Sequence, residues 1–231
     1  EQAILFPISA LEEYGPHLPI GTYTFLTDRL CMNVQEQLKQ QGKHSVIAPP
    51  LFWGRNHTTG SFPGSFNLQS ETLIHLVLDI LTDFERWGFH NIIMINLHAD
   101  TPHNHSLLQA CTQARQKGVK VFYLIPFQSL SIYQLTGNEE FILTYHMPSF
   151  ETSPFYPDIH AGSLETSWMA ADFPKYVNRS LAKQLKSTKA TTEDLSVWPK
   201  GWDEFEKKFP LGYCGDPSNI QIKKAKEFET K

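Results

Sequence analysis

The sequence predicts a three-layer α/β fold, in which a mostly parallel central sheet is flanked by helices. Short apolar runs alternate with segments of helical spacing through the first half of the chain. One of these runs, Asn91–Asn96 (NIIMIN), is apolar almost throughout, which is typical of a parallel strand buried on both faces. With 231 residues, 41% of them hydrophobic, the chain can bury such a core, and we predict a single domain over residues 1–231.

Each element follows from its own pattern. Gly88 and Gly118 predict the ends of two helices, and Ser70 is the expected N-cap of the first of them. The aromatic stretch Pro126–Pro157 predicts irregular structure. Strands are predicted at Ala3–Ile8, Val46–Leu51, Asn91–Asn96 and Val119–Ile125, and helices at Phe25–Gln40, Ser70–Trp87, His103–Lys117 and Ser163–Ala171.

Composition narrows the class of protein. The 24 acidic and 20 basic residues give a net charge of -4, without the concentrated Lys/Arg face that binding nucleic acid requires. The three cysteines have no CxxC spacing, so we expect neither a disulfide framework nor a thiolate zinc site. No apolar run is long enough to span a membrane, and the N-terminus lacks the pattern of a signal peptide. We therefore expect a cytoplasmic protein.

Three segments that follow predicted strands are rich in ligand-type side chains, as expected for a site at strand carboxyl ends. In the first segment, Glu12 and His17 supply the oxygen and nitrogen donors that suit zinc or manganese. The alternative is a loop whose polar side chains serve only its turns.

The second segment follows the NIIMIN strand. Because His98 and Asp100 lie two residues apart, an extended backbone projects both to the same side, toward one cation or one substrate. His103 and His105 open the next helix, where solvated first-turn residues are the more common case.

The third segment begins with His160 and enters a helix. The neutral imidazole of His160 suits general base and then general acid catalysis. Glu165, five residues on, is a candidate to orient it. The alternative is that Ser163 caps a helix whose first turn contains Glu165. His57, in the Gly54–Phe66 loop, is a weaker candidate for contact with substrate.

Taken together and in this order, the motifs resemble the creatininase family of metal-dependent amidohydrolases. The family segments EQHGPHLPxxxD, FPGT, NGHGGN or NGHxEN, HAGxxETS and a late GDP turn have counterparts along nearly the whole chain. These counterparts are Glu12–Pro19, Phe62–Ser65, Asn96–Asp100, His160–Ser167 and Gly215–Pro217.

The resemblance implies a metal site, with two departures. Glu12, His98 and Asp100 match metal ligands of the family, whereas Tyr14 and Tyr23 stand where a histidine and a bridging aspartate are expected. A neutral phenol is a poor ligand near pH 7. We therefore expect a divalent ion, zinc or manganese, at no more than one per chain, with an empty site as the alternative.

Three interpretations remain open. In the first, the chain hydrolyses a small amide or cyclic amide, with metal-bound water as nucleophile and His160 as proton shuttle. In the second, the site only binds a small molecule, and in the third the chain is an assembly subunit without catalysis. We place hydrolysis first because four polar groups of the site are kept. His17, His57 and Tyr156 are the expected substrate contacts, and the resemblance implies a homo-oligomer, with a hexamer as the expected size.

Overall fold

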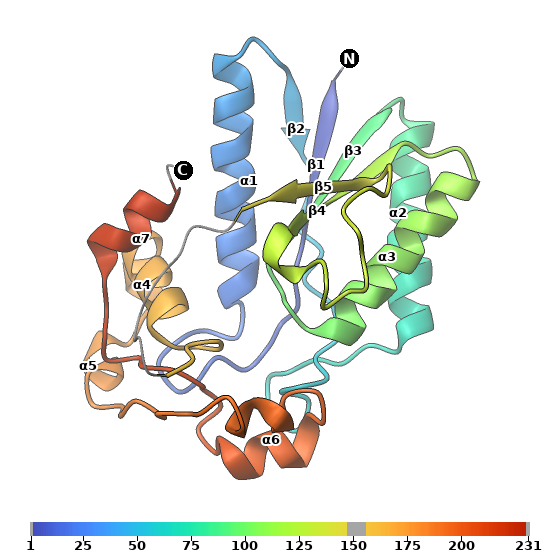
Figure 1. Cartoon of the computed structure of the whole chain (residues 1–231). Helices are drawn as coiled ribbons and strands as arrows, with labels where there is room; N and C mark the ends of the chain where they lie inside the picture. The colour runs from blue at the N-terminus through green and yellow to red at the C-terminus, as the bar shows by residue number, and fades with distance from the viewer. Residues whose placement is uncertain (1, 147–155, 230–231) are drawn as a thin grey trace. The chain divides into compact units, whose positions relative to one another are not determined.

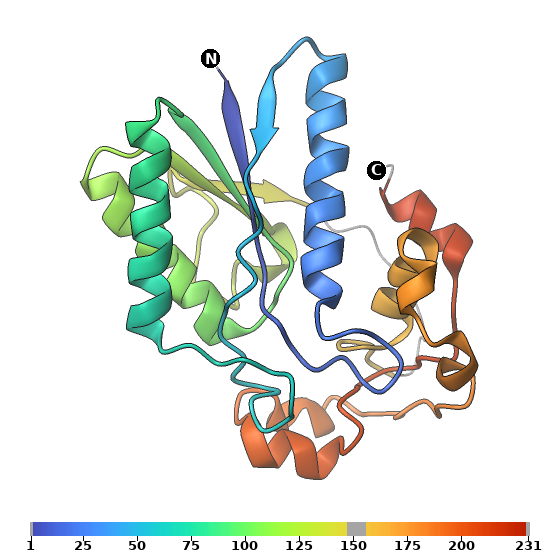
Figure 2. The same cartoon turned by 180° about the vertical axis from the view of Figure 1, so that it is seen from behind.

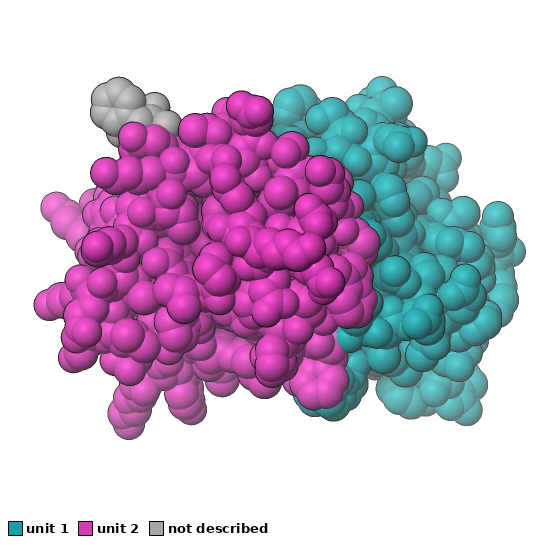
Figure 3. All heavy atoms as spheres, turned by 90° about the horizontal axis from the view of Figure 1, so that it is seen from below, with its two compact units in different colours: residues 1–10, 27–56, 67–147 teal, residues 11–26, 57–66, 148–231 magenta. Residues whose placement is uncertain are grey.

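The computed structural model describes residues 2–146 and 156–229, and the chain divides into two compact units, coloured separately in Figure 3. The single domain expected over residues 1–231 stays a prediction. Each unit is described by itself. Unit 1 comprises Glu1–Ala10, Thr27–Asn56 and Asn67–Met147, and unit 2 comprises Leu11–Leu26, His57–Phe66 and Pro148–Lys231.

Unit 1 is built on a five-stranded sheet in which all strand pairs are parallel. The strand order is β2-β1-β3-β4-β5, so the NIIMIN strand lies in the middle of the sheet, as predicted. This arrangement confirms the predicted α/β fold class. The strands are β1 (Ala3–Ile8), β2 (Ser45–Ile47), β3 (Asn91–Asn96), β4 (Val121–Pro126) and β5 (Ile142–Tyr145).

Helices cover both faces of this sheet (Figures 1 and 2). Residues Ile4, Phe6 and Ile8 of β1 pack in one core with α2 (Ser70–Arg86) and α3 (Thr101–Gln116). The intervening Leu5 points to the other face, where it packs with Cys31 and its neighbours on α1 (Thr22–Gln40), whose first five residues count with unit 2. The period of two along a strand therefore divides one apolar run between two cores.

Two elements differ from the prediction. Strand β2 ends at Ile47 rather than Leu51, because Pro49 and Pro50 have no N–H to continue the ladder. Strand β5 lies inside the stretch 126–157 that we expected to be irregular, and residues 147–155 of that stretch lie outside the described residues. A four-residue edge strand is too short for its alternation to stand out from an aromatic segment.

The N-terminus of α2 also differs. Gln69, not Ser70, is its N-cap, and no side chain caps it. The Ser70 hydroxyl instead hydrogen-bonds the Ser106 hydroxyl on α3 at 2.8 Å. Across the described parts of both units, no helix combines the length and the apolar character needed to cross a bilayer.

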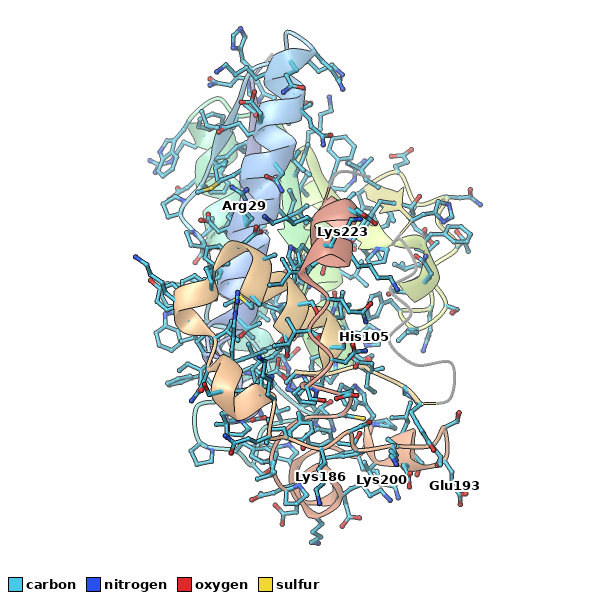
Figure 4. All side chains as sticks on the ribbon, turned by 90° about the vertical axis from the view of Figure 1, so that its left-hand side faces the viewer. Arg29, His105, Lys186, Glu193, Lys200 and Lys223 are labelled. Atoms are coloured by element: carbon cyan, nitrogen blue, oxygen red, sulfur yellow. The ribbon has the colours of Figure 1, made fainter. Side chains whose placement is uncertain are left out.

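Unit 2 consists of short helices around a small aromatic core. Phe62, Phe205 and Phe209 are buried there with Cys214, and Trp198 packs against them. Lys186, Lys200 and Glu193 extend from the polar surface of this unit (Figure 4). Its helices are α4 (Ser163–Asp172), α5 (Arg179–Ala182), α6 (Trp202–Lys208) and α7 (Ile222–Glu229), with 3-10 turns at Pro174–Tyr176 and Asp194–Val197; a further 3-10 turn, Phe127–Ser129, belongs to unit 1.

Asp158 fixes the backbone that carries the third motif. Its carboxylate accepts hydrogen bonds from the backbone N–H groups of Ser163 at 2.8 Å, Asp216 at 3.0 Å and Leu164 at 3.4 Å. A Cβ added to Gly162 would lie 2.3 Å from Asp158 Oδ1, so only glycine fits at this position. Sequence reasoning missed Asp158, although it stands only two residues before His160.

We predict that Gly162→Ala lowers the free energy of unfolding by about 1–3 kcal/mol, because the added methyl group displaces a carboxylate held by three backbone donors. Urea unfolding followed by circular dichroism measures the loss. Gly21→Ala is the matched control in the same unit, since its Cβ would meet Phe25 at an ordinary 3.5 Å. Equal effects of the two substitutions would contradict the role of Asp158.

Candidate functional site

The first and third motifs meet in unit 2 around His160. This residue is 3% exposed, and its backbone forms an isolated antiparallel bridge with Cys214. Its Nε2–H donates to the Glu13 carbonyl oxygen at 2.9 Å, and the Glu13 carboxylate lies 3.9 Å from the same nitrogen. The imidazole is therefore oriented by Glu13, a residue that the sequence did not single out.

The electrostatics of this cluster favour a protonated His160. Burial alone lowers the pKa of an imidazole, but the carboxylates of Glu12, Glu13 and Glu165 outweigh it and raise the pKa of His160 to about 9. Burial in turn raises the pKa of Glu13 and of Glu165. With this pKa His160 holds its proton at neutral pH, and the role expected from the sequence, general base and then general acid, stays a prediction.

Tyr14 and Tyr23 lie inside the same cluster. The Tyr14 ring packs on the His160 ring with centroids 4.5 Å apart and meets the Tyr23 ring edge-on at 5.2 Å. Burial raises the pKa of both phenols well above its usual range, and neighbouring acidic groups raise it further. Both side chains are therefore neutral aromatic groups at physiological pH.

Glu165 lies in the first turn of α4, where the sequence placed it. Its Oε1 accepts a hydrogen bond from the Tyr23 hydroxyl at 3.0 Å, while its Oε2 is buried without a hydrogen bond. The expected hydrogen bond from His160 goes to Glu13 instead, so Glu165 acts on His160 through charge.

Glu12 is held by the Gly/Pro-rich loop. Thr59 donates to Glu12 Oε1 at 2.8 Å, and Ser65 donates to Thr59 at 3.1 Å. The same Ser65 oxygen accepts from the Glu13 N–H at 3.0 Å. The loop motif Phe62–Ser65 thus positions both glutamates, and Thr59, like Asp158 and Glu13, is a residue that the sequence analysis missed.

The predicted substrate contacts in unit 2 have different surroundings. His17 is buried and shares a hydrogen bond with Thr166 at 2.8 Å; burial, aided by the charge of His160, lowers its pKa to about 4. His57 hydrogen-bonds the Pro199 carbonyl at 3.0 Å from a partly exposed position, and Tyr156 is 36% exposed.

The second motif lies in unit 1, at the carboxyl end of β3. Asp100 is the N-cap of α3 and accepts from the His103 N–H at 3.0 Å. His98 donates from Nε2 to the Arg55 carbonyl at 2.7 Å, and His103 Nδ1 accepts from the Arg55 N–H at 3.2 Å. His103 is fully buried rather than solvated, and burial lowers its pKa well below the usual range.

Whether unit 2 can bind the metal ion implied by the resemblance depends on its donor atoms. In unit 2 two of the expected ligand positions hold neutral phenols, and His160 has its Nε2 committed to Glu13. Among the described residues, no group of three or more His, Cys, Asp and Glu side chains is arranged to hold a metal ion. The residues of unit 2 taken by themselves do not fit the metal ion, so no catalytic step is derived through it.

The metal site expected from Glu12, His98 and Asp100 is not tested by this geometry. Glu12 belongs to unit 2, whereas His98 and Asp100 belong to unit 1. That site stays a prediction, as do the roles of the other candidate residues. What the structure does bring together, within unit 2, is Glu12, Glu13, Tyr14, Tyr23, His160 and Glu165, which we call the His160 cluster.

A buried imidazole among carboxylates, with shifted pKa values, marks the His160 cluster as a candidate catalytic site. The family model of creatininase (creatinine amidohydrolase) matches residues 1–231. The chain therefore belongs to the creatininase family, which confirms the resemblance.

Two curated relatives match most of the chain. The 3-dehydro-scyllo-inosose hydrolase of Thermotoga maritima is 26% identical over 86% of this chain and 57% of its own length. The creatinine amidohydrolase of Pseudomonas putida is 25% identical over 85% of this chain and 73% of its own length. This chain thus spans little more than half of the first relative.

Solved structures share the fold. A manganese creatininase aligns over 99% of this chain and 85% of its own with a TM-score of 0.70 and 19% identity. A putative creatinine amidohydrolase from Bacteroides fragilis aligns over 98% of this chain and 83% of its own with a TM-score of 0.66 and 18% identity. Another of the solved creatininases is described as a Zn-Zn type.

We predict that the pKa values of two buried histidines are shifted in opposite directions from the usual value. His160 should titrate near 9 and His17 near 4, and histidine-labelled NMR measures both midpoints. Between pH 6.5 and 9 the folded chain holds a proton on His160 that the unfolded chain releases, so its contribution to stability falls as pH rises. Between pH 6.5 and 4 the unfolded chain takes up a proton that folded His17 refuses, so stability falls as pH drops.

Urea unfolding across this range provides the second measurement. His160→Gln should flatten the alkaline fall and leave the acid fall in place. A His160 midpoint near 6.5 would contradict the clustering of carboxylates around it.

Proposed function

We propose that the chain hydrolyses a C–N bond in a small amide or cyclic amide, with His160 and Glu165 performing the proton transfers. The observation that carries this proposal is the His160 cluster, in which three carboxylates raise the pKa of one buried imidazole and burial raises the pKa of Glu13 and Glu165. Perturbed groups of this kind concentrate at catalytic sites. Membership of a family whose named relatives include hydrolases supports the same class of reaction.

The two groups have complementary roles. Glu165 Oε2 is buried without a hydrogen bond, and its raised pKa makes the ionised carboxylate a stronger base. It takes a proton from water as the water oxygen bonds to the amide carbon. His160, already protonated, donates to the nitrogen as the C–N bond breaks. The products are a carboxylic acid and an amine, and proton exchange with solvent restores both residues.

The substrate contacts stay part of the proposal. His17, neutral because burial and the charge of His160 lower its pKa to about 4, offers a ring nitrogen, Nδ1, that is buried without a hydrogen bond. His57 and Tyr156 are more exposed and are proposed to contact the part of the substrate farther from the reacting bond. The expectation of one zinc or manganese ion per chain at most belongs to the same proposal, and elemental analysis tests it.

We predict that hydrolysis depends on both His160 and Glu165. The assay uses creatinine, formylated amines and short peptides as probes, with and without added zinc or manganese. His160→Gln and Glu165→Gln should each lower kcat/KM by about 10²–10⁴-fold. His90→Gln, at an exposed histidine of unit 1 paired with Glu85, is the control and should retain activity.

The pH profile provides a second test of the same roles. Activity should fall as pH rises through about 9, where His160 loses the proton that it donates. It should also fall in acid, where Glu165 becomes protonated. Failure of the wild-type chain to hydrolyse any probe under any condition would remove the proposal.

Binding without catalysis is the second candidate, and the packing of Tyr14 and Tyr23 favours it. The two rings occupy the cluster and the Tyr23 hydroxyl already satisfies one Glu165 oxygen. Calorimetry with the same probes distinguishes the two candidates, because a binder without catalysis gives saturable heat and no product.

The expected homo-oligomer has its own test, which also bears on the assembly interpretation. We predict a homo-oligomer of this chain at micromolar concentration, with a hexamer as the expected size. Light scattering coupled to size-exclusion chromatography measures the mass against 26.5 kDa for one chain. A monomer would remove both the predicted assembly and the role of assembly subunit.

A further inference from the structure

Two aromatic side chains occupy the centre of the His160 cluster. The Tyr14 ring stacks on His160 with an interplanar angle of 37°, and the Tyr23 ring meets Tyr14 at 76°. Tyr14 is completely buried, and the Tyr23 hydroxyl ends on Glu165. The phenols thus form a continuous path of contacts from His160 to Glu165.

We propose that Tyr14 and Tyr23 are positioning residues that make the His160 cluster independent of a metal ion, the Tyr14 ring holding His160 and the Tyr23 hydroxyl holding Glu165. The proposal deepens the proposed function and rests on it for the assignment of this site. Its test measures metal binding rather than catalytic turnover, so this proposal and the proposed function can fail independently of each other.

The hydrogen bonds of the carboxylates support this proposal. One oxygen of each glutamate is engaged: Glu12 by Thr59, Glu13 by the Gly15 N–H, and Glu165 by Tyr23. A structural or catalytic zinc ion takes at least three protein ligands, and neutral phenols do not provide the third. The part of Tyr14 that contacts His160 is its ring, at 4.5 Å between centroids, so the ring is the part that positions the imidazole.

The position of His160 supports it as well. Its Nε2 lies 2.9 Å from the Glu13 carbonyl oxygen and 3.9 Å from the Glu13 carboxylate, and the Tyr14 ring lies against the imidazole. The imidazole is therefore held in place by groups of unit 2 without a metal ion.

The experiment compares metal binding in four chains: wild type, Tyr14→Phe, Tyr14→His with Tyr23→Asp, and Tyr176→His. Each is treated with chelator, desalted, and titrated with zinc or manganese chloride, with the His160 ring resonance followed by NMR. The wild-type and Tyr14→Phe resonances should not move, because the ring stack is kept. The double variant should bind at least one ion and shift that resonance.

Tyr176→His adds an imidazole at an exposed phenol of the same unit and controls for adventitious binding. Ions bound by wild type that shift the His160 resonance would overturn the proposal. A folded double variant that binds no more than Tyr176→His would also overturn it, because the phenols would then not be what excludes the metal. If the double variant does not fold, Tyr14→Phe decides: an ion-dependent shift in this variant contradicts the proposal, and its absence supports it.

Discussion

The burial of three carboxylates around one imidazole is the constraint on which unit 2 depends. Removing a carboxylate from water costs several kcal/mol unless a positive charge or good donors compensate it. Here His160 provides the charge, and Thr59, Tyr23 and the Gly15 N–H provide the donors. Loss of His160 would leave this group of glutamates uncompensated, so the stability of unit 2 depends on the side chain to which the proposed function assigns proton donation.

The backbone that carries this cluster is rigid for reasons that lie outside it. Asp158 gathers three N–H groups from two separate segments, and Cys214 pairs with the His160 backbone from the other side. Gly162 and Gly215 are glycines because a Cβ at either would collide with Asp158. The residues around His160 thus fix the path of the backbone, and the side chains of the His160 cluster take their positions from that backbone.

The sequence predicted the parallel sheet because a strand buried on both faces is apolar along its whole length, a pattern that is visible without knowledge of tertiary contacts. It predicted most of the helices from their periodic spacing. The candidate site was less accessible. His160 and Glu165 follow from their motif, but the partner of His160 is the backbone carbonyl of Glu13, and no side-chain pattern signals a carbonyl. His103 shows the same limit: first-turn histidines are commonly solvated, yet the Arg55 backbone buries this one. Local spacing indicates candidates, whereas burial and residues distant in the sequence shift their pKa values.

The source of positive charge is a further property that distinguishes sites of this kind. A buried acidic site needs a cation, which a metal ion, a substrate or an imidazolium can supply. The two phenols favour the imidazolium, because they add no charge and the Tyr14 ring covers one face of the imidazole. Because Tyr14 and Tyr23 add no charge, the His160 imidazolium is the positive charge that faces the glutamates within the cluster. Under the function proposed above, the proton that balances this charge is the one donated to the leaving nitrogen, so the proposed chemistry and the burial of the glutamates depend on the same group.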